Sequence, residues 1–442
     1  MNYKVAIVSL GCEKNRVDAE MLLFSLKEKG FTLVDDPAMC DAVIVNTCGF
    51  IESAKQESID EIIELGKLKS EGKIKKIIVT GCLAQRYQKE ISENLPEVDA
   101  VLGIGANADI ADMVLKTLNG ENPEVFPDKT LLPLEGRRIQ STPSYYAYIK
   151  IAEGCSNRCS YCAIPLIRGR FRSRKMEDII SEAETLAENG VKELIVIAQD
   201  TTKYGADLYG KPCLAQLLRK LCRIDGLRWI RVLYCYPENL TDELIDTIAE
   251  EEKIVKYIDL PMQHCSEQVL NNMNRRGNRE ELKSKVEKIR ERIPDITVRT
   301  TFITGFPGET EEDFASLEEF AKEMRFQRLG CFAYSQEEGT KAALMPNQID
   351  SETKQKRADI IMEQQQIIME EYCKQLVGQT VTVLCEGYDR YAECFYGRSQ
   401  ADAPEVDGVV FFNSNGKKPS PGEFVRVEIY DYLGCDPIGE MI

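Results

Sequence analysis

Between residues 145 and 373 the chain repeats one pattern six times, a short apolar run followed in most cases by an amphipathic stretch with helical spacing. The six runs are Ala147–Ala152, Leu194–Ala198, Ile230–Tyr234, Lys256–Leu260, Val298–Ile303 and Leu329–Tyr334. Strands that alternate with helices form parallel sheets covered by helices. Six such units predict a partial version of the (β/α)8 barrel, whose active site lies at the carboxyl ends of the strands.

The rest of the chain divides around this section. Its 442 residues exceed what one hydrophobic core usually holds, so several domains are expected. Residues 1–125 alternate short strands with helices and predict a parallel α/β sheet domain. Residues 126–144 lack a clear period and predict a linker, and 145–373 form the partial barrel. Residues 374–442 follow a long helical pattern and contain four strand-like runs, which predict a small all-β barrel.

The segment GCSNRCSYC at 154–162 follows the first strand of the predicted barrel. It places Cys155, Cys159 and Cys162 in a C-x3-C-x2-C spacing. Three thiolates hold three corners of a four-iron cube and leave the fourth iron open, whereas an electron-transfer cluster normally has four cysteines. Zinc is the alternative, but zinc sites usually pair two C-x2-C units, and the chain has no second one. The spacing therefore favours an iron–sulfur cluster with a free coordination site.

Three further cysteines lie directly after predicted strands of the N-terminal section. Cys12 follows Val5–Leu10, Cys48 follows Ala42–Asn46 and Cys82 follows Ile77–Thr80. Because the carboxyl ends of parallel strands share one edge of a sheet, these thiols are expected to meet in space. Ordinary buried cysteines are the alternative. The equivalent positions favour a second three-cysteine cluster.

Composition restricts the remaining possibilities. The chain has one histidine, His264, which argues against Ser-His-Asp catalysis and histidine-rich metal sites. Because it stands alone, we interpret His264 as a structural residue. Sixteen cysteines in a long chain are not typical of a disulfide scaffold. No apolar run reaches the ~18–20 residues of a membrane span, and no signal-peptide layout precedes the first strand. We therefore expect a soluble, cytoplasmic protein with no membrane partner.

The two cysteine triads, in this order, resemble the methylthiotransferases among the radical S-adenosylmethionine (SAM) enzymes. The resemblance covers essentially the whole chain and implies an N-terminal cluster domain, a radical SAM barrel and a C-terminal TRAM barrel. It implies two 4Fe-4S clusters and two SAM molecules per turnover, one as methyl donor and one as source of a 5′-deoxyadenosyl radical. It also implies sulfur carried at the N-terminal cluster, a sulfur donor, and an electron donor such as flavodoxin or ferredoxin.

The resemblance also suggests residues that contact SAM. Tyr161 matches an aromatic residue near the adenine, and Gln199 and Asp200 follow the second strand, where the family contacts the amino group. Gly305 and Gly308, in TGFPGETEED, allow close approach of the backbone. Packing and turn formation are the alternatives. Radical hydrogen abstraction needs no general base, so no catalytic acid or base is expected.

The branch of the family is indicated by SLGCEKNRVDAE at 9–20, NTCGFIESAKQES at 46–58 and GRSQADAPEVDGVV at 397–410. These segments resemble the branch that modifies the β-carbon of an aspartate in ribosomal protein S-twelve of the small subunit. The chain carries a net charge of −17, and an acidic β-barrel would attract a basic protein and repel tRNA phosphate. Asp402, Glu405 and Asp407 are the predicted substrate contacts, with a solvated loop as the alternative. Methylthiolation of tRNA adenosine and a non-catalytic, redox-sensing iron–sulfur protein are the competing hypotheses.

Four arginines follow the cysteine loop, Arg168, Arg170, Arg172 and Arg174. A guanidinium group binds a carboxylate through two parallel hydrogen bonds, so the carboxylate of SAM or of the substrate is one predicted partner. Solvated charges at the start of a helix are equally consistent with this sequence.

Overall fold

The computed structural model describes residues 3–442, beginning with a six-stranded parallel sheet in the order β2-β1-β3-β4-β5-β6. Its strands are β1 (Lys4–Ser9), β2 (Thr32–Leu33), β3 (Ala42–Thr47), β4 (Lys76–Gly81), β5 (Ala100–Leu102) and β6 (Glu124–Val125). Its helices are α1 (Glu13–Glu28), α2 (Glu52–Ser70), α3 (Cys82–Arg86), α4 (Gln88–Asn94) and α5 (Ile110–Leu118), with 3-10 turns η1 (Pro37–Met39) and η2 (Ile104–Asp109). Apolar side chains of β3 alternate between two cores, one on each face of the sheet, which confirms the predicted parallel α/β domain.

The central section is a partial barrel of six strands in two parallel sheets, β11-β10-β7 and β12-β13-β14, joined by a bridge between Ile230 and Ile254. The strands are β7 (Tyr146–Lys150), β10 (Glu193–Ile197), β11 (Trp229–Val232), β12 (Tyr257–Asp259), β13 (Thr297–Thr304) and β14 (Arg328–Ala333), with a short hairpin of β8 (Ala152–Glu153) and β9 (Arg172–Ser173). All six predicted strands are present.

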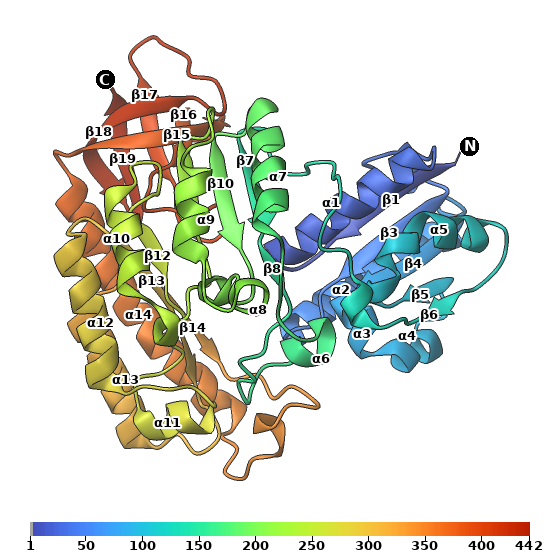
Figure 1. Cartoon of the computed structure of the whole chain (residues 1–442), viewed down its shortest axis with the longest axis horizontal. Coiled ribbons are helices and arrows are strands. Elements are labelled where there is room, and N and C mark those ends of the chain that lie inside the picture. Colours follow the sequence, from blue (N-terminus) through green and yellow to red (C-terminus); the bar gives the residue numbers. More distant parts are fainter. Residues whose placement is uncertain (1–2) are drawn as a thin grey trace.

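Helices surround this half barrel, most of them on its outer side (Figure 1). They are α6 (Ile164–Arg168), α7 (Met176–Glu188), α8 (Ala206–Tyr209), α9 (Leu214–Leu221), α10 (Asp242–Glu250), α11 (Glu267–Asn272), α12 (Arg279–Arg292), α13 (Glu311–Met324) and α14 (Ser351–Leu376), with 3-10 turns η4 (Thr201–Lys203), η5 (Pro237–Asn239) and η6 (Ala342–Leu344). Local sequence sets the helix starts. Thr310 and Asp313 form a reciprocal capping box at the start of α13.

The C-terminal section is a closed five-stranded barrel in the order β15-β16-β17-β19-β18. Its strands are β15 (Thr380–Asp389), β16 (Cys394–Arg398), β17 (Val410–Ser414), β18 (Phe424–Leu433) and β19 (Asp436–Met441). The sequence reading predicts the first four strands and misses β19. This strand contains Pro437 and Gly439, which weaken a strand signal, yet a Cβ at Gly439 would lie 2.4 Å from Val427 Cγ1. Glycine is therefore needed where β19 closes the barrel.

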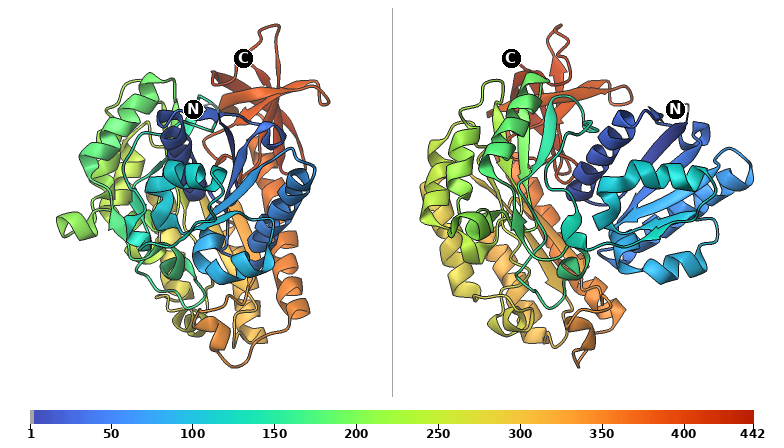
Figure 2. Two further views of the ribbon diagram at one scale, coloured as in Figure 1. Left: turned by 90° about the vertical axis from the view of Figure 1, so that its right-hand side faces the viewer. Right: turned by 45° about the vertical axis from the view of Figure 1, so that its right-hand side comes forward.

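The N-terminal sheet lies beside the open side of the half barrel, and the C-terminal barrel lies at one end (Figures 1 and 2). Residues 126–144, the predicted linker, include η3 (Lys129–Leu131) and run from the N-terminal sheet domain to the half barrel. They are hydrogen-bonded to α1. Arg138 Nη1 donates to Glu20 Oε2 at 2.5 Å, and Ser141 N donates to Glu20 Oε1 at 2.7 Å. No helix in residues 3–442 has the length and apolar character needed to cross a membrane.

Candidate functional site

The C-x3-C-x2-C loop leaves the barrel after β8 and is closed by its own backbone. Cys155 N donates to Gly169 O at 3.1 Å, and Gly154 adopts φ +74°. A Cβ at Gly154 would lie 2.3 Å from Arg170 O, so only glycine fits this turn. The closure places Cys155 and Cys159, each 6% exposed, at the active face of the half barrel together with Cys162.

These three thiols share one buried environment. Burial raises the pKa of Cys155 to about 11, and the nearby Cys159 acts in the same direction. Burial also raises the pKa of Cys162, with further contributions from Cys159 and Cys155. The three sulfurs therefore lie close enough to affect one another. Thiols bind iron as thiolates, so a metal at this site would have to displace their protons, and its binding would strengthen as the pH rises.

The second triad forms where three adjacent strands end. The strands β1, β3 and β4 are neighbours, and their register pairs Ser9 with Asn46 and Thr47 with Gly81. Cys12, Cys48 and Cys82 follow those ends, as the sequence predicts. A Cβ at Gly11 would lie 2.8 Å from Cys48 Sγ, so the turn before Cys12 packs directly against Cys48.

Burial raises the pKa of Cys82 to about 12, Arg168 opposes the change, and Cys48 and Cys12 increase it. The triad is thus a shared environment of three thiols. Among residues 3–442 no three His, Cys, Asp or Glu side chains are grouped tightly enough to hold a single metal ion. Both triads offer only sulfur ligands, the donor set of iron–sulfur clusters.

Helix α6 and the residue before it connect the two triads. Cys82 packs with Ala163 and Ile167, which directly follow Cys162 in the sequence. At the end of α6, Arg168 Nη2 lies 3.5 Å from Cys82 Sγ. Figure 1 shows α6 between the half barrel and the N-terminal sheet. One short helix therefore links the loop of the first triad to a ligand candidate of the second.

A buried cluster of charges joins α1 to the half barrel beside this helix. Arg168 Nη1 contacts Asp18 Oδ2 at 2.8 Å and Glu153 Oε2 at 2.9 Å. Lys150 pairs with the same two carboxylates, and all four side chains are at most 2% exposed. Two cations and two anions balance, which reduces the cost of burying each charge. The cations hold the pKa of Glu153 well below its usual range despite burial.

Sequence reasoning did not find Asp18, Lys150 and Glu153. A signal exists in YAYIKIAEGC, where two charged residues interrupt a strand that otherwise consists of core residues. Arg168 is not available to SAM or substrate in this structure, because its donors are already used within the chain. Arg174 is likewise paired, with Glu135 and Glu182 at 2.6 Å each.

Gln199 and Asp200 lie at the carboxyl end of β10, beside the cysteine loop. Gln199 Nε2 donates to Glu153 Oε1 at 2.7 Å, whereas Gln199 Oε1 is buried and has no hydrogen-bond partner in the described part of the chain. A buried acceptor without a donor fits an amino group supplied by a ligand. Asp200 Oδ2 accepts from Asn157 Nδ2 at 2.8 Å, so it also orders the cysteine loop.

The remaining predicted SAM contacts lie nearby but differ in character. Tyr161 packs against an apolar cluster that includes Phe306 and Tyr334. Gly305 has φ +69°, and a Cβ there would lie 2.2 Å from the Lys354 side chain, so its glycine makes room for α14. Gly308 has φ +84°, and a Cβ there would meet only Asn272 Nδ2 at 3.9 Å. Of the two glycines, only Gly308 leaves open space.

His264 is fully buried, as a structural histidine should be. Ser266 N donates to its Nδ1 at 2.9 Å, and its Nε2 lies 3.6 Å from Glu309 Oε2. Burial lowers its pKa to about 4, so the ring is neutral at physiological pH. Only one ring nitrogen is satisfied, because Nε2 has no hydrogen-bond partner in the described part of the chain.

The expectation that Asp402 and Asp407 meet a substrate is not what the structure shows. Asp402 is 3% exposed, pairs with Arg328, and accepts from Ser399 Oγ at 2.6 Å. Asp407 accepts from Tyr257 Oη at 2.8 Å. The carboxylates face arginines at the amino ends of the half-barrel strands, because a buried acid requires a partner. Only Glu405 remains exposed, and it pairs with Arg16 of α1 at 2.8 Å.

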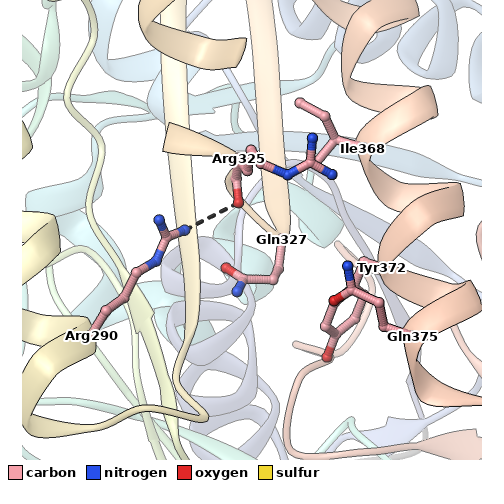
Figure 3. A pocket seen from close by; sticks show the side chains of 6 residues that line it. All are labelled: Arg290, Arg325, Gln327, Ile368, Tyr372 and Gln375. Carbon is pink, nitrogen blue, oxygen red and sulfur yellow. Dashed lines mark hydrogen bonds between the residues drawn. The ribbon is translucent and has the colours of Figure 1, made fainter. Parts of the chain in front are cut away.

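A hollow of about 200 Å³ lies away from both triads, among α12, the α13–β14 turn and α14 (Figure 3). Arg290 donates there to Met324 O at 2.6 Å and to Arg325 O at 3.1 Å. These are the free carbonyls at the end of α13, so Arg290 has a capping role. The hollow gives no sign of a ligand site.

Three known families match successive parts of the chain. Residues 4–103 match the uncharacterized protein family UPF0004, 149–321 the radical SAM superfamily, and 377–442 the TRAM domain. The chain is similar over its whole length to the ribosomal protein uS12 methylthiotransferase RimO of Thermoanaerobacter sp. (strain X514), with 52% identity over 99% of each chain. Identity to the protein of that name from Clostridioides difficile (strain 630) is 51%, again over 99% of each chain.

A solved structure shares the fold. The radical S-adenosylmethionine methyltransferase TsrM from Kitasatospora setae, determined with cobalamin and a [4Fe-4S] cluster, superposes with a TM-score of 0.57. The match covers 75% of each chain at 17% sequence identity. It supports the architecture described above.

Proposed function

This chain belongs to the RimO family of radical SAM methylthiotransferases, and we propose that it methylthiolates the β-carbon of an aspartate in ribosomal protein uS12, the S-twelve protein of the small subunit. The observation that carries the proposal is the connection of the two cysteine triads through α6, with Cys82 packed against the helix that follows Cys162. Radical generation and sulfur transfer need two centres close to one substrate atom. The full-length similarity to uS12 methylthiotransferases supports the choice of substrate.

We assign one 4Fe-4S cluster to Cys155, Cys159 and Cys162 and a second to Cys12, Cys48 and Cys82. When bound, the clusters and SAM supply the radical, the methyl group and the site that carries sulfur. The chain's own residues position these groups. Gln199 presents its buried carbonyl oxygen to the amino group of SAM, and Glu153 holds the Gln199 amide in that orientation. Asp200 and Asn157 order the cysteine loop.

A basic protein substrate fits the charge of the C-terminal barrel. Residues 374–442 contain 6 basic and 11 acidic residues, a net charge of −5. Glu428 on β18 and Glu440 on β19 are exposed and directly opposite one another, and neither has an ion-pair partner in the described part of the chain. Like charges opposite one another destabilise a sheet, so a basic partner would relieve the repulsion. We place the substrate-facing acids here and not at Asp402 and Asp407.

Reconstitution tests this function. Purified protein loaded with iron and sulfide, and given SAM, a reductant and recombinant uS12, is expected to form 5′-deoxyadenosine and methylthiolated uS12. A flavodoxin or ferredoxin and a separate sulfur donor are expected to serve in the cytoplasm. Modification of tRNA adenosine with uS12 left unchanged would instead support the tRNA activity. Loaded, reduced protein that never cleaves SAM would support the non-catalytic alternative.

A further inference from the structure

Lys14 is a buried cation without a hydrogen-bond acceptor. It is 6% exposed, and its Nζ has no hydrogen-bond partner among residues 3–442. The nearest carboxylate oxygen, Glu13 Oε2, lies 3.6 Å away, too far for a good hydrogen bond. An ammonium group removed from water without acceptors is costly, so such a group is a sign of a missing partner.

Lys14 lies beside the N-terminal triad, at the mouth of the half barrel. It lies two residues after Cys12, at the start of α1. Its Nζ lies 3.4 Å from the centroid of the Tyr234 ring, which follows β11 on the active face of the half barrel. Lys14 therefore bridges the edge of the N-terminal sheet and the mouth of the barrel.

Tyr234 is held in an unusual conformation beneath Lys14. Its φ is +61°, which is strained for a residue with a side chain. Tyr234 N donates to Asp259 Oδ2 at 2.8 Å, and Tyr234 Oη donates to Glu13 Oε2 at 3.0 Å. These bonds keep the ring under the ammonium group. Glu13 Oε2 accepts from Tyr234 and faces Lys14 Nζ at 3.6 Å, an ion pair longer than a hydrogen bond, so the donors of Lys14 are unused within the described residues.

Two other buried cations between α1 and the half barrel have their hydrogen-bond donors paired with carboxylates. Lys150 and Arg168 both pair with Asp18 and Glu153. Each of them is hydrogen-bonded to two carboxylates, whereas Lys14 lies on an aromatic face with one carboxylate, Glu13, at 3.6 Å. A cation–π contact orients an ammonium group but leaves hydrogens available for an anion.

We propose that Lys14 binds the side-chain carboxylate of the target aspartate and so holds its β-carbon between the two triads. The inference rests on the proposed function and deepens it by naming the residue that recognises the substrate acid. An ammonium group forms a charge-assisted hydrogen bond to a carboxylate and a weaker one to a neutral amide. Lys14 therefore selects aspartate over asparagine at the modified position.

The test compares Lys14→Met and Lys14→Arg with the wild type, using recombinant uS12 and a uS12 in which the target aspartate is replaced by asparagine. Methionine keeps an unbranched apolar stem and removes only the charge. Lys27→Met is the matched control, because Lys27 is exposed on the same helix. Iron content and the electron paramagnetic resonance spectrum of the reduced clusters show whether each variant is loaded.

Lys14→Met is expected to raise the KM for native uS12 by about tenfold or more, with partial recovery in Lys14→Arg and no change in Lys27→Met. The wild type is expected to prefer the aspartate substrate, and Lys14→Met to lose that preference. A wild-type KM in loaded Lys14→Met would overturn the proposal. If that variant does not load, wild-type enzyme that binds both substrates equally would overturn it. Wild-type enzyme that leaves uS12 unmodified would instead contradict the proposed function.

Discussion

At the scale of single residues, Arg168 and His264 show how burial determines what a charged group does. The sequence alone indicates the six cysteines as candidate cluster ligands, because each follows a strand or lies in a short motif. It does not predict which charges are buried beside them, since Asp18 and Lys150 are 132 positions apart and meet only after the domains dock. The sequence similarly offers Arg168 as a ligand-binding residue, whereas the structure shows a fully paired side chain.

Replacing Arg168 by Gln is expected to weaken the N-terminal triad. The change removes the donor to Cys82 and leaves Asp18 and Glu153 with Lys150 as their only cation in the buried cluster. Breaking a buried pair costs about 3–5 kcal/mol. Reconstituted protein should therefore contain less iron and unfold at lower denaturant concentration. Arg170→Gln, with an exposed side chain, is the control. If Arg168→Gln kept the iron content and the denaturant midpoint of the wild type, Arg168 would not stabilise the N-terminal triad.

His264 is expected to make the protein less stable as the pH falls. Its folded pKa is lowered to about 4 by burial, with Asp313 opposing and Arg357 adding to the change, so the unfolded chain takes up the proton first. The stabilising effect is complete above about pH 6.5 and is lost as the pH falls towards 4, a change of about 3 kcal/mol. Urea unfolding of wild type and His264→Gln between pH 7 and pH 5 measures the difference. Parallel pH dependences would contradict the assignment.

At the scale of elements, the pattern of apolar residues determines the strands, while tertiary contacts determine where they end. The second of the four strand-like runs in the C-terminal section spans Tyr391–Gly397. In the structure this strand begins at Cys394, because Asp389 Oδ1 accepts from Tyr391 N and Ala392 N and forms a turn. The acidic loop at 402–407 looks like a solvated or substrate-facing segment. Its partners, Arg328 and Tyr257, lie in another domain, and nothing in the local sequence reveals them.

Replacing Asp402 by Asn is expected to destabilise the protein without a specific effect on substrate affinity. It would leave the buried Arg328 without its closest anion, at a cost of about 3–5 kcal/mol. Glu405→Gln is the matched control, since its pair with Arg16 is half exposed and contributes about 0–1 kcal/mol. Denaturant unfolding of the full-length variants gives both values. A stable Asp402→Asn protein with a raised KM for uS12 would restore Asp402 as a substrate contact.

At the scale of the whole molecule, the three sections are joined by a shared apolar cluster and by many polar contacts. Glu13, Asp18 and Glu20 of α1 each bond to residues of the half barrel or the segment before it. Arg86, at the end of α3, pairs at 2.6 Å with Glu337, which follows β14 of the half barrel. Because the contacts are directional, they hold the N-terminal sheet in one orientation against the half barrel. A fixed orientation is what a reaction with a radical source and a sulfur carrier requires.

The most direct test is the intact mass of uS12 from cells that lack this protein and from the same cells complemented with wild type, Cys82→Ala or Cys155→Ala. The account predicts that wild type restores one methylthio group on one aspartate and that neither variant does, because each removes a ligand of a different cluster. Methylthiolated uS12 in the cells that lack the protein, or in either variant, would contradict it.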